Sequence, residues 1–184
     1  LDFLEFEGGE PFFHNYHLDV LKKISQQRSC QDMRIRYNTN GTVFLDARAL
    51  WKNFKETHIC FSIDDIGQRF EYQRTNATWK KVSKNLDLFN EIQDEQITMS
   101  FFVTVSIQNV FYLPELLAEL DPYGWPINLN LLIAPKSLSI FEMTPKAKTA
   151  TLEKLKRLLK MPSKHHDDMS NLVCALEKIG RAHV

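Results

Sequence analysis

Cysteine is scarce in this sequence, and its few residues lie far apart. They are Cys30, Cys60 and Cys174, and no two of them have the spacing of a Cys-x-x-Cys motif or a zinc knuckle. An odd number of distant cysteines is typical of reduced thiols and not of a disulfide framework. The composition therefore favours a cytoplasmic protein.

Long apolar runs and an excess of charge are also missing. No run among the 184 residues has the length of a membrane span. Lys+Arg and Asp+Glu both number 23, so the formal net charge is +0. Binding to nucleic acid through bulk charge needs basic patches that neutralise phosphates. We therefore expect neither a membrane nor a nucleic acid as a partner.

Familiar catalytic and metal-binding patterns are absent as well. The sequence has no glycine-rich phosphate loop of the Walker or Rossmann type, and no Ser/His/Asp or Cys/His arrangement stands out. His165-His166 beside Asp167-Asp168 has the composition of a metal tract. Because this segment follows the last expected strand, we interpret it as a solvated linker. We predict no catalytic residue and no metal ligand in the chain.

What the sequence does contain is a regular change between strand-like and helix-like periods. Alternating apolar residues predict strands at 1–7, 33–37, 58–63, 97–105 and 127–133. Apolar residues three and four apart predict helices at 18–24, 50–54, 79–89, 114–120, 145–159 and 169–176. The segment 68–74 is expected to be a polar loop.

This order predicts one domain of the α/β class. The connections are long enough for parallel crossovers, which are almost always right-handed. We therefore expect a parallel sheet of five strands, ordered as in the chain. In such sheets, ligands bind outside the carboxyl ends of the strands.

Polar side chains lie near the end of every expected strand. They are Glu10, Asn40, Ser62 with Asp64, Ser106 with Asn109, and Asn130. A zwitterionic, hydroxyl-rich ligand suits this set, with its carboxylate on Arg74 and its amino group on Glu10. Each group taken alone is more often part of a turn, a helix cap or a solvated loop than of a binding site. Their recurrence at successive strand ends favours a binding site.

With these residues identified, residues 1–160 resemble the radical S-adenosylmethionine enzymes, in the branch whose barrel is followed by a SPASM or twitch domain. Gly8-Gly9-Glu10-Pro11 resembles the Gly-Gly-Glu motif of that family, which binds the methionyl amino group of the cofactor. Ser62-Ile63-Asp64 resembles its Ser-x-Asp strand end. The segment 70–74 is similar to the one whose arginine binds the cofactor carboxylate, which implies that role for Arg74.

Two further segments extend the resemblance. Thr104-Val105-Ser106 with Asn109 resembles the strand end that contacts the ribose, and Leu132-Ile133 lies where a later strand lines the adenine. The resemblance implies an S-adenosylmethionine site. Its residues are Gly8, Gly9, Glu10, Pro11, Asn40, Ser62, Asp64, Arg74, Ser106, Asn109, Leu132 and Ile133.

The resemblance also implies a [4Fe–4S] cluster, but the Cys-x-x-x-Cys-x-x-Cys motif that holds it in the family is absent. In the family that motif follows the first strand. We therefore interpret residues 1–161 as a partial (β/α) barrel that lacks its first βα unit. Residues 162–184 are then a linker and helix towards a missing twitch or SPASM domain, and 179–184 resemble a translated sequencing adapter.

The implied function is reductive cleavage of S-adenosylmethionine at the cluster, which gives a 5′-deoxyadenosyl radical that modifies a substrate. The substrate is a peptide or a small molecule, and the fragment alone is expected to be inactive. One alternative is a non-catalytic α/β module that binds a nucleotide-like ligand at the same strand ends. A conventional barrel aldolase or hydrolase is a weaker alternative, because no Schiff-base lysine or pair of carboxylates stands at the strand ends.

Overall fold

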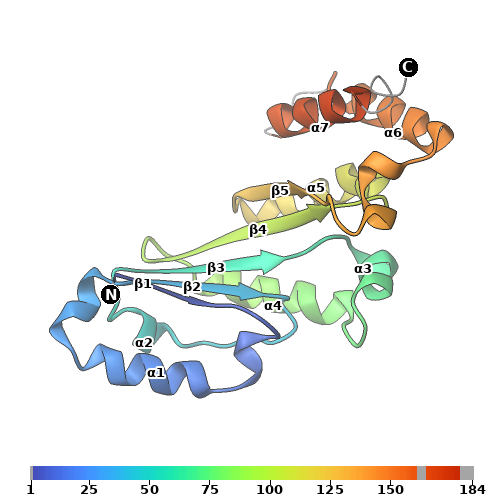
Figure 1. Ribbon diagram of the computed structural model, residues 1–184. Helices are drawn as coiled ribbons and strands as arrows, with labels where there is room; N and C mark the ends of the chain where they lie inside the picture. The colour runs from blue at the N-terminus through green and yellow to red at the C-terminus, as the bar shows by residue number, and fades with distance from the viewer. Residues whose placement is uncertain (1, 161–164, 179–184) are drawn as a thin grey trace. The chain divides into compact units, whose positions relative to one another are not determined.

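Five strands form one parallel sheet in the computed structural model, which describes residues 2–160 and 165–178. The strands are β1 (Phe3–Phe6), β2 (Arg34–Thr39), β3 (Glu56–Ser62), β4 (Ile97–Val105) and β5 (Ile127–Leu131). Their order in the sheet is β1-β2-β3-β4-β5, the same as in the chain (Figure 1). The predicted α/β class, strand number and strand order are confirmed.

Helices and short 3-10 turns connect the strands. The α-helices are α1 (Tyr16–Ser25), α2 (Arg48–Trp51), α3 (Gly67–Gln73), α4 (Trp79–Ile92), α5 (Leu113–Leu120), α6 (Pro145–Leu158) and α7 (His166–Lys178). The 3-10 turns are η1 (Pro11–Phe13), η2 (Arg28–Asp32), η3 (Val110–Tyr112), η4 (Asp121–Tyr123), η5 (Lys136–Leu138) and η6 (Ile140–Glu142). Every predicted helix has a counterpart among them.

Helix α3 replaces the polar loop that we predicted at 68–74, so that prediction is wrong. Phe70 is its buried residue, and its ring packs edge-on against Trp79 of α4 with a centroid distance of 5.4 Å. The buried carboxylate of Asp65 accepts hydrogen bonds from the Ile66 N–H and the Arg69 Nε–H just before and within the first turn. One apolar contact and one carboxylate therefore hold a helix whose remaining residues are polar.

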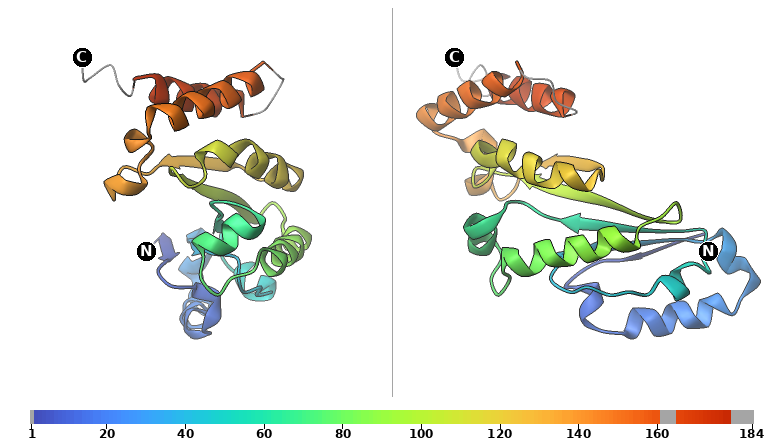
Figure 2. Two further views of the ribbon diagram at one scale, coloured as in Figure 1. Left: turned by 90° about the vertical axis from the view of Figure 1, so that its right-hand side faces the viewer. Right: turned by 180° about the vertical axis from the view of Figure 1, so that it is seen from behind.

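The chain divides into two compact units. The first unit comprises Leu1–Val103 and Tyr123–Asn128, and the second comprises Thr104–Pro122 and Leu129–Val184. In the first unit, α1, α2 and α4 lie on one face of the sheet (Figure 2). The core between them is aromatic, because the ring of Tyr37 on β2 packs at a tilt against Phe12 and Trp51, and Phe61 of β3 contacts Phe89 of α4.

Gly41 allows β2 to end close against α4. Its φ is +75°, and a Cβ atom there would lie 3.2 Å from the Val82 side chain of α4. The Gly41 carbonyl accepts a hydrogen bond of 2.8 Å from the buried Asn85 amide on the same helix. A side chain at this position would be strained by the backbone conformation and would crowd Val82.

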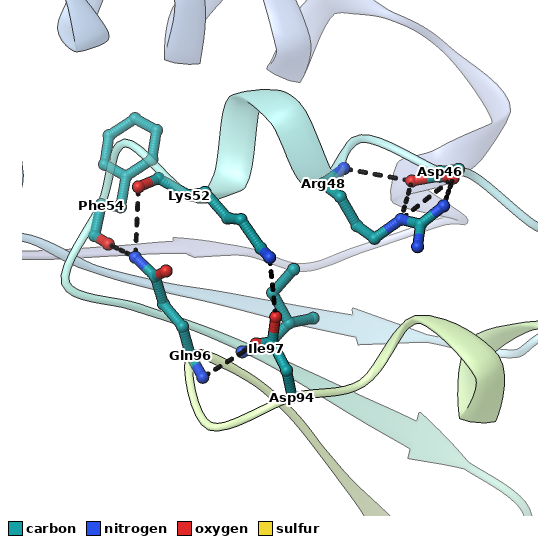
Figure 3. Close-up of polar contacts among 7 residues, drawn as sticks. All are labelled: Asp46, Arg48, Lys52, Phe54, Asp94, Gln96 and Ile97. Carbon is teal, nitrogen blue, oxygen red and sulfur yellow. Dashed lines mark hydrogen bonds and ion pairs between the residues drawn. The ribbon is translucent and has the colours of Figure 1, made fainter.

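Polar contacts fix the amino ends of β3 and β4 (Figure 3). The Gln96 amide donates to the carbonyls of Lys52 and Phe54, which precede β3. Asp94 accepts the Ile97 N–H at 2.8 Å and lies 2.9 Å from the Lys52 ammonium. These contacts set where both strands begin.

In the second unit, α6 and α7 pack together through buried residues that include Leu155 and Leu172. His165, just before α7, is buried, and its Nε2 atom lies 2.5 Å from the Asp121 carboxylate. Our interpretation of His165 as part of a solvated linker is therefore wrong, because Asp121 supplies the polar partner that makes its burial possible. The predicted linker residues 162–164 and the 179–184 segment lie outside the described residues.

Among the described helices, none combines the length and the apolar character that crossing a membrane requires.

Candidate cofactor-binding site

The predicted site residues of the first unit lie at the carboxyl ends of β1, β2 and β3. Parallel pairing of these strands in register brings their carboxyl ends to one edge of the sheet. Glu10 follows β1, Asn40 follows β2, and Ser62 and Asp64 lie at the end of β3. We call these residues, with Arg74, the rim.

Two glycines form the turn that leaves β1. Gly8 has a φ of +84° and Gly9 a φ of +55°, which are left-handed conformations that favour glycine. A Cβ atom added to either residue would meet nothing within 4 Å. Backbone conformation therefore requires the glycines here, and the space beside them is open.

The Glu10 carboxylate accepts hydrogen bonds from a residue that follows β1 and from two residues at the end of β2. Its Oε1 atom accepts the Thr39 hydroxyl at 2.7 Å and the Phe12 N–H at 3.2 Å, while Oε2 accepts the Asn40 N–H at 2.9 Å. Pro11, which has no N–H, starts η1 directly after Glu10. A carboxylate has roughly four acceptor positions. One of them is thus left for a further donor, and Glu10 has no ion-pair partner within the described part of the chain.

Asn40 shapes the turn after β2. Its Oδ1 atom accepts both the N–H of Thr42, at 2.9 Å, and the Thr42 hydroxyl, at 2.6 Å. The backbone N–H of Asn40 goes to Glu10. Asn40 thus helps to position the Glu10 carboxylate through its backbone N–H. A direct contact between the Asn40 side chain and a ligand stays a prediction.

Asp64 and Arg74 come from different elements and contact each other. The Arg74 Nη2 atom, at the carboxyl end of α3, donates to Asp64 Oδ2 at 2.7 Å. The two side chains are only 20% and 26% exposed, respectively. Arg74 Nε is shielded from solvent and has no hydrogen-bond partner among the described residues. The guanidinium is therefore held in place by Asp64, with one N–H group that no residue in the described ranges accepts.

Asp65 is a structural residue that the sequence reasoning missed. Besides Ile66 and Arg69, it accepts a bond of 3.4 Å from the Gln73 amide, so one carboxylate fixes both ends of α3. The i, i+4 spacing of Asp65 and Arg69 was the available signal. Because α3 ends at Arg74, Asp65 also sets the position of the rim arginine.

The remaining predicted residues belong to the second unit. Asn109 is buried, accepts the Ser106 N–H at 2.8 Å and donates to the Thr104 carbonyl at 2.8 Å. The Leu132 N–H bonds the Val105 carbonyl at 2.9 Å, and Ile133 is 71% exposed. The Asn109 amide thus closes the turn after β4, and its contact with a ribose stays a prediction.

The described residues do not fit a [4Fe–4S] cluster. No group of three or more His, Cys, Asp or Glu side chains in the described ranges is arranged to hold a metal ion. Cys30, Cys60 and Cys174 are free thiols, and the first two are buried. Three thiolates converging on one cluster are therefore not available from this set.

A cavity of about 610 Å³ lies away from the rim, at the amino end of β3. Its walls are mostly amide and lysine side chains, including Gln31, Lys55 and Gln96, and the last of these already donates to two carbonyls. Parallel sheets bind ligands at the opposite, carboxyl edge. We therefore assign the candidate site to the rim.

Neither a protein-family model nor a curated protein matches the chain. Solved structures do. Native anSMEcpe with bound AdoMet and Cp18Cys peptide matches with a TM-score of 0.59 and 18% identity, covering 86% of this chain and 46% of that one. Histidine-tagged anSMEcpe with bound AdoMet matches with a TM-score of 0.58 and 17% identity, covering 85% and 44%. The chain therefore spans less than half the length of these structures.

Identity this low shows the fold alone. The chain thus shares the fold of part of a protein that was solved with bound AdoMet, which agrees with the predicted resemblance at the level of the fold.

Proposed function

We propose that this chain is the S-adenosylmethionine-binding part of a radical S-adenosylmethionine enzyme, with its sheet forming part of a (β/α) barrel. The observation that carries the proposal is the Glu10 carboxylate. It lies at the carboxyl end of β1 with three protein donors, one acceptor position left and open space beside Gly8 and Gly9. The likeness of the fold to structures that hold AdoMet supports the same assignment.

Each rim residue has a role in this proposal. Glu10 accepts the methionyl ammonium, and Gly8 and Gly9 leave the approach to it free of side chains. Arg74 holds the carboxylate through a planar, permanently charged group. Asp64, which orients Arg74, also accepts a ribose hydroxyl. In the second unit, the assignment of Ser106, Asn109, Leu132 and Ile133 to ribose and adenine rests on the resemblance alone.

The chemistry that this chain contributes is binding and orientation. A bound S-adenosylmethionine supplies the methionyl and adenosyl groups, and its reductive cleavage requires a cluster whose ligands the described residues do not provide. We propose a peptide as the substrate class, because anSMEcpe was solved with the Cp18Cys peptide and with the Kp18Cys peptide. The 1–161 core and the following twitch or SPASM domain stay predictions.

Amide chemical shifts test the proposal in the 184-residue chain. We expect S-adenosylmethionine to bind weakly, with a dissociation constant on the order of millimolar, because no iron chelates its amino acid group. The backbone N–H signals of Gly9 and Asn40 should move during the titration. Glu10→Gln should abolish these shifts, while Glu7→Gln, an exposed carboxylate in the same turn, should preserve them.

Two outcomes would count against this function. Rim amides that stay unmoved at high cofactor concentration would show that the site is assigned wrongly. Tight binding with a clear calorimetric heat would favour the alternative, a self-contained module for a nucleotide-like ligand.

A further inference from the structure

The face of the sheet opposite α1, α2 and α4 carries polar residues in rows across the strands; we call it the polar face. One row consists of Glu5, Arg36, His58 and Thr98, which pair directly from β1 to β4. The next row toward the rim contains Asn38, Cys60 and Ser100. Strand alternation alone places these residues on one face.

Four side chains form a continuous hydrogen-bonded series, which we call the relay. The Thr98 hydroxyl lies 3.3 Å from Glu56 Oε1 and 2.9 Å from Nδ1 of His58. Nε2 of His58 lies 2.8 Å from the Ser100 hydroxyl. Both nitrogens of the imidazole are thus engaged by hydroxyl groups, each of which can donate or accept.

The Glu56 carboxylate sets the direction of the relay. An ionised carboxylate only accepts, so the single hydroxyl proton of Thr98 goes to Glu56. Thr98 must then accept from His58, which places the imidazole proton on Nδ1. Nε2 is left as the acceptor for the Ser100 hydroxyl. This is the tautomer in which the imidazole can take a proton from the side of Ser100.

His58 is neutral in this arrangement for a physical reason. Burial lowers the pKa of His58, and the positive charge of Arg36 on β2 lowers it further, against a smaller opposing effect of Glu56. Glu5 on β1 lies 3.4 Å from Arg36 and belongs to the same row. The imidazole is thus a free base near neutral pH, available to accept a proton.

The two ends of the relay differ in exposure. The Glu56 side chain is 40% exposed, whereas Ser100 is 3% exposed. Ser100 lies in the row of Cys60, and Ser62 of the rim follows Cys60 by two positions, about 7 Å along the strand. The relay therefore runs from water to a point beside the rim.

We propose that Glu56, Thr98, His58 and Ser100 form a proton-transfer path that connects a substrate beside the rim to water. This proposal rests on the proposed function, because it places a substrate next to the cofactor site. It applies to substrates that leave the reaction with one proton fewer.

The transfer is balanced without any electron change. A substrate X–H bond breaks as its proton moves to the Ser100 oxygen, and the Ser100 proton moves to Nε2 of His58. The Nδ1 proton passes to Thr98, and the Thr98 proton passes to Glu56, which releases it to water. One proton leaves the substrate, and the X–H electron pair stays on X.

Nitrogen-15 NMR of the His58 imidazole in the 184-residue chain tests the direction of the relay. We expect the Nδ1–H tautomer to predominate at neutral pH. Glu56→Gln should populate both tautomers of His58, because an amide can donate to the Thr98 hydroxyl as well as accept from it. The same substitution should slow the exchange of the imidazole N–H proton with water. Arg34→Gln is the matched control: Arg34 lies 3.9 Å from Glu56 on the same face and outside the relay.

The outcomes are distinguishable. A predominant Nε2–H tautomer in the unsubstituted chain would overturn the proposal. So would an unchanged exchange rate in Glu56→Gln, since the relay would then be only structural. A tautomer and exchange response that holds while S-adenosylmethionine leaves the rim amides unmoved would support the relay and contradict the proposed function separately.

Discussion

At the scale of single residues, the carboxylates and histidines that the fold encloses determine what the molecule can bind and how it responds to pH. Glu10 connects the turn after β1 to the end of β2 through three hydrogen bonds. Its charge therefore matters for stability as well as for a ligand.

Glu10→Gln should destabilise the chain by about 1–2 kcal/mol, because three bonds to a charged acceptor become weaker and the new amide group faces donors. Urea unfolding followed by circular dichroism measures the change. Glu7→Gln, exposed in the same turn, should leave the unfolding midpoint in place. Equal midpoints for the two variants would show that the Glu10 contacts contribute nothing.

Buried histidines make the stability depend on pH. Burial lowers the pKa of His17, which packs against the rings of Phe6, Phe12 and Tyr37, as it does for His58. In the unfolded chain these residues take up protons near pH ~6.5, before the folded chain does. Their contribution to stability is therefore fully present above that pH and is lost as the pH falls towards their lowered pKa.

We accordingly expect the free energy of unfolding to fall between about pH 7 and pH 5, and His17→Phe to flatten part of this slope. His14→Phe, at an exposed position three residues earlier, is the control and should keep the slope of the unsubstituted chain. Urea titrations at several pH values provide the measurement. A slope that His17→Phe leaves unchanged would contradict the assignment.

The positions of the rim residues could be predicted from the sequence, but the side chains that they contact could not. Glu10, Asn40 and Asp64 could be found because polar residues begin where each apolar alternation stops. The contact between Asp64 and Arg74 could not, since it depends on where α3 ends. The relay was missed because His58, Thr98 and Ser100 read as the polar half of two strands, and only the strand register shows that they meet.

At the scale of elements, the periodicity of apolar residues determines which helices and strands can be predicted from the sequence. The strands carry long apolar alternations, and α4 carries a full stripe from Val82 to Ile92, so both could be predicted. Helix α3 could not, because Phe70 is its only buried apolar residue and a single residue has no period. Besides the contact of Phe70 with Trp79, the Asp65 carboxylate stabilises this helix, and no apolar pattern in the sequence contains such a hydrogen bond.

Asp65→Asn should therefore destabilise the first unit by about 2 kcal/mol, because it removes a charge-assisted bond to Arg69 and weakens the bond from the Ile66 N–H. Asp46→Asn is the matched control. Asp46 also pairs with an arginine at short range, Arg48, but both side chains are exposed and such pairs contribute little (Figure 3). Urea unfolding compares the two variants, and a loss for Asp65→Asn no greater than for Asp46→Asn would contradict this account of α3.

At the scale of the whole molecule, the parallel order of the sheet follows from its connections. Each strand is joined to the next through at least one helix or 3-10 turn, and elements that follow one another in the chain through short connections tend to lie side by side. The division into two units could not be predicted, because no change of composition marks it. It falls within β4 and β5, where the apolar alternation runs on.

This order leaves β1 at one end of the sheet, with β2 as its neighbour. An edge strand presents unpaired N–H and C=O groups, and in β1 they accompany Phe3, which is 46% exposed. We expect the isolated chain to self-associate through this edge.

Phe3→Lys should reduce the association, because a charged side chain on an edge opposes pairing with a second strand. Val20→Lys provides the matched control, since Val20 is 44% exposed but lies on α1, where the backbone groups are paired within the helix. Light scattering at increasing concentration measures both variants. If Val20→Lys reduces association as much as Phe3→Lys, exposed apolar surface is the cause and the β1 edge is not.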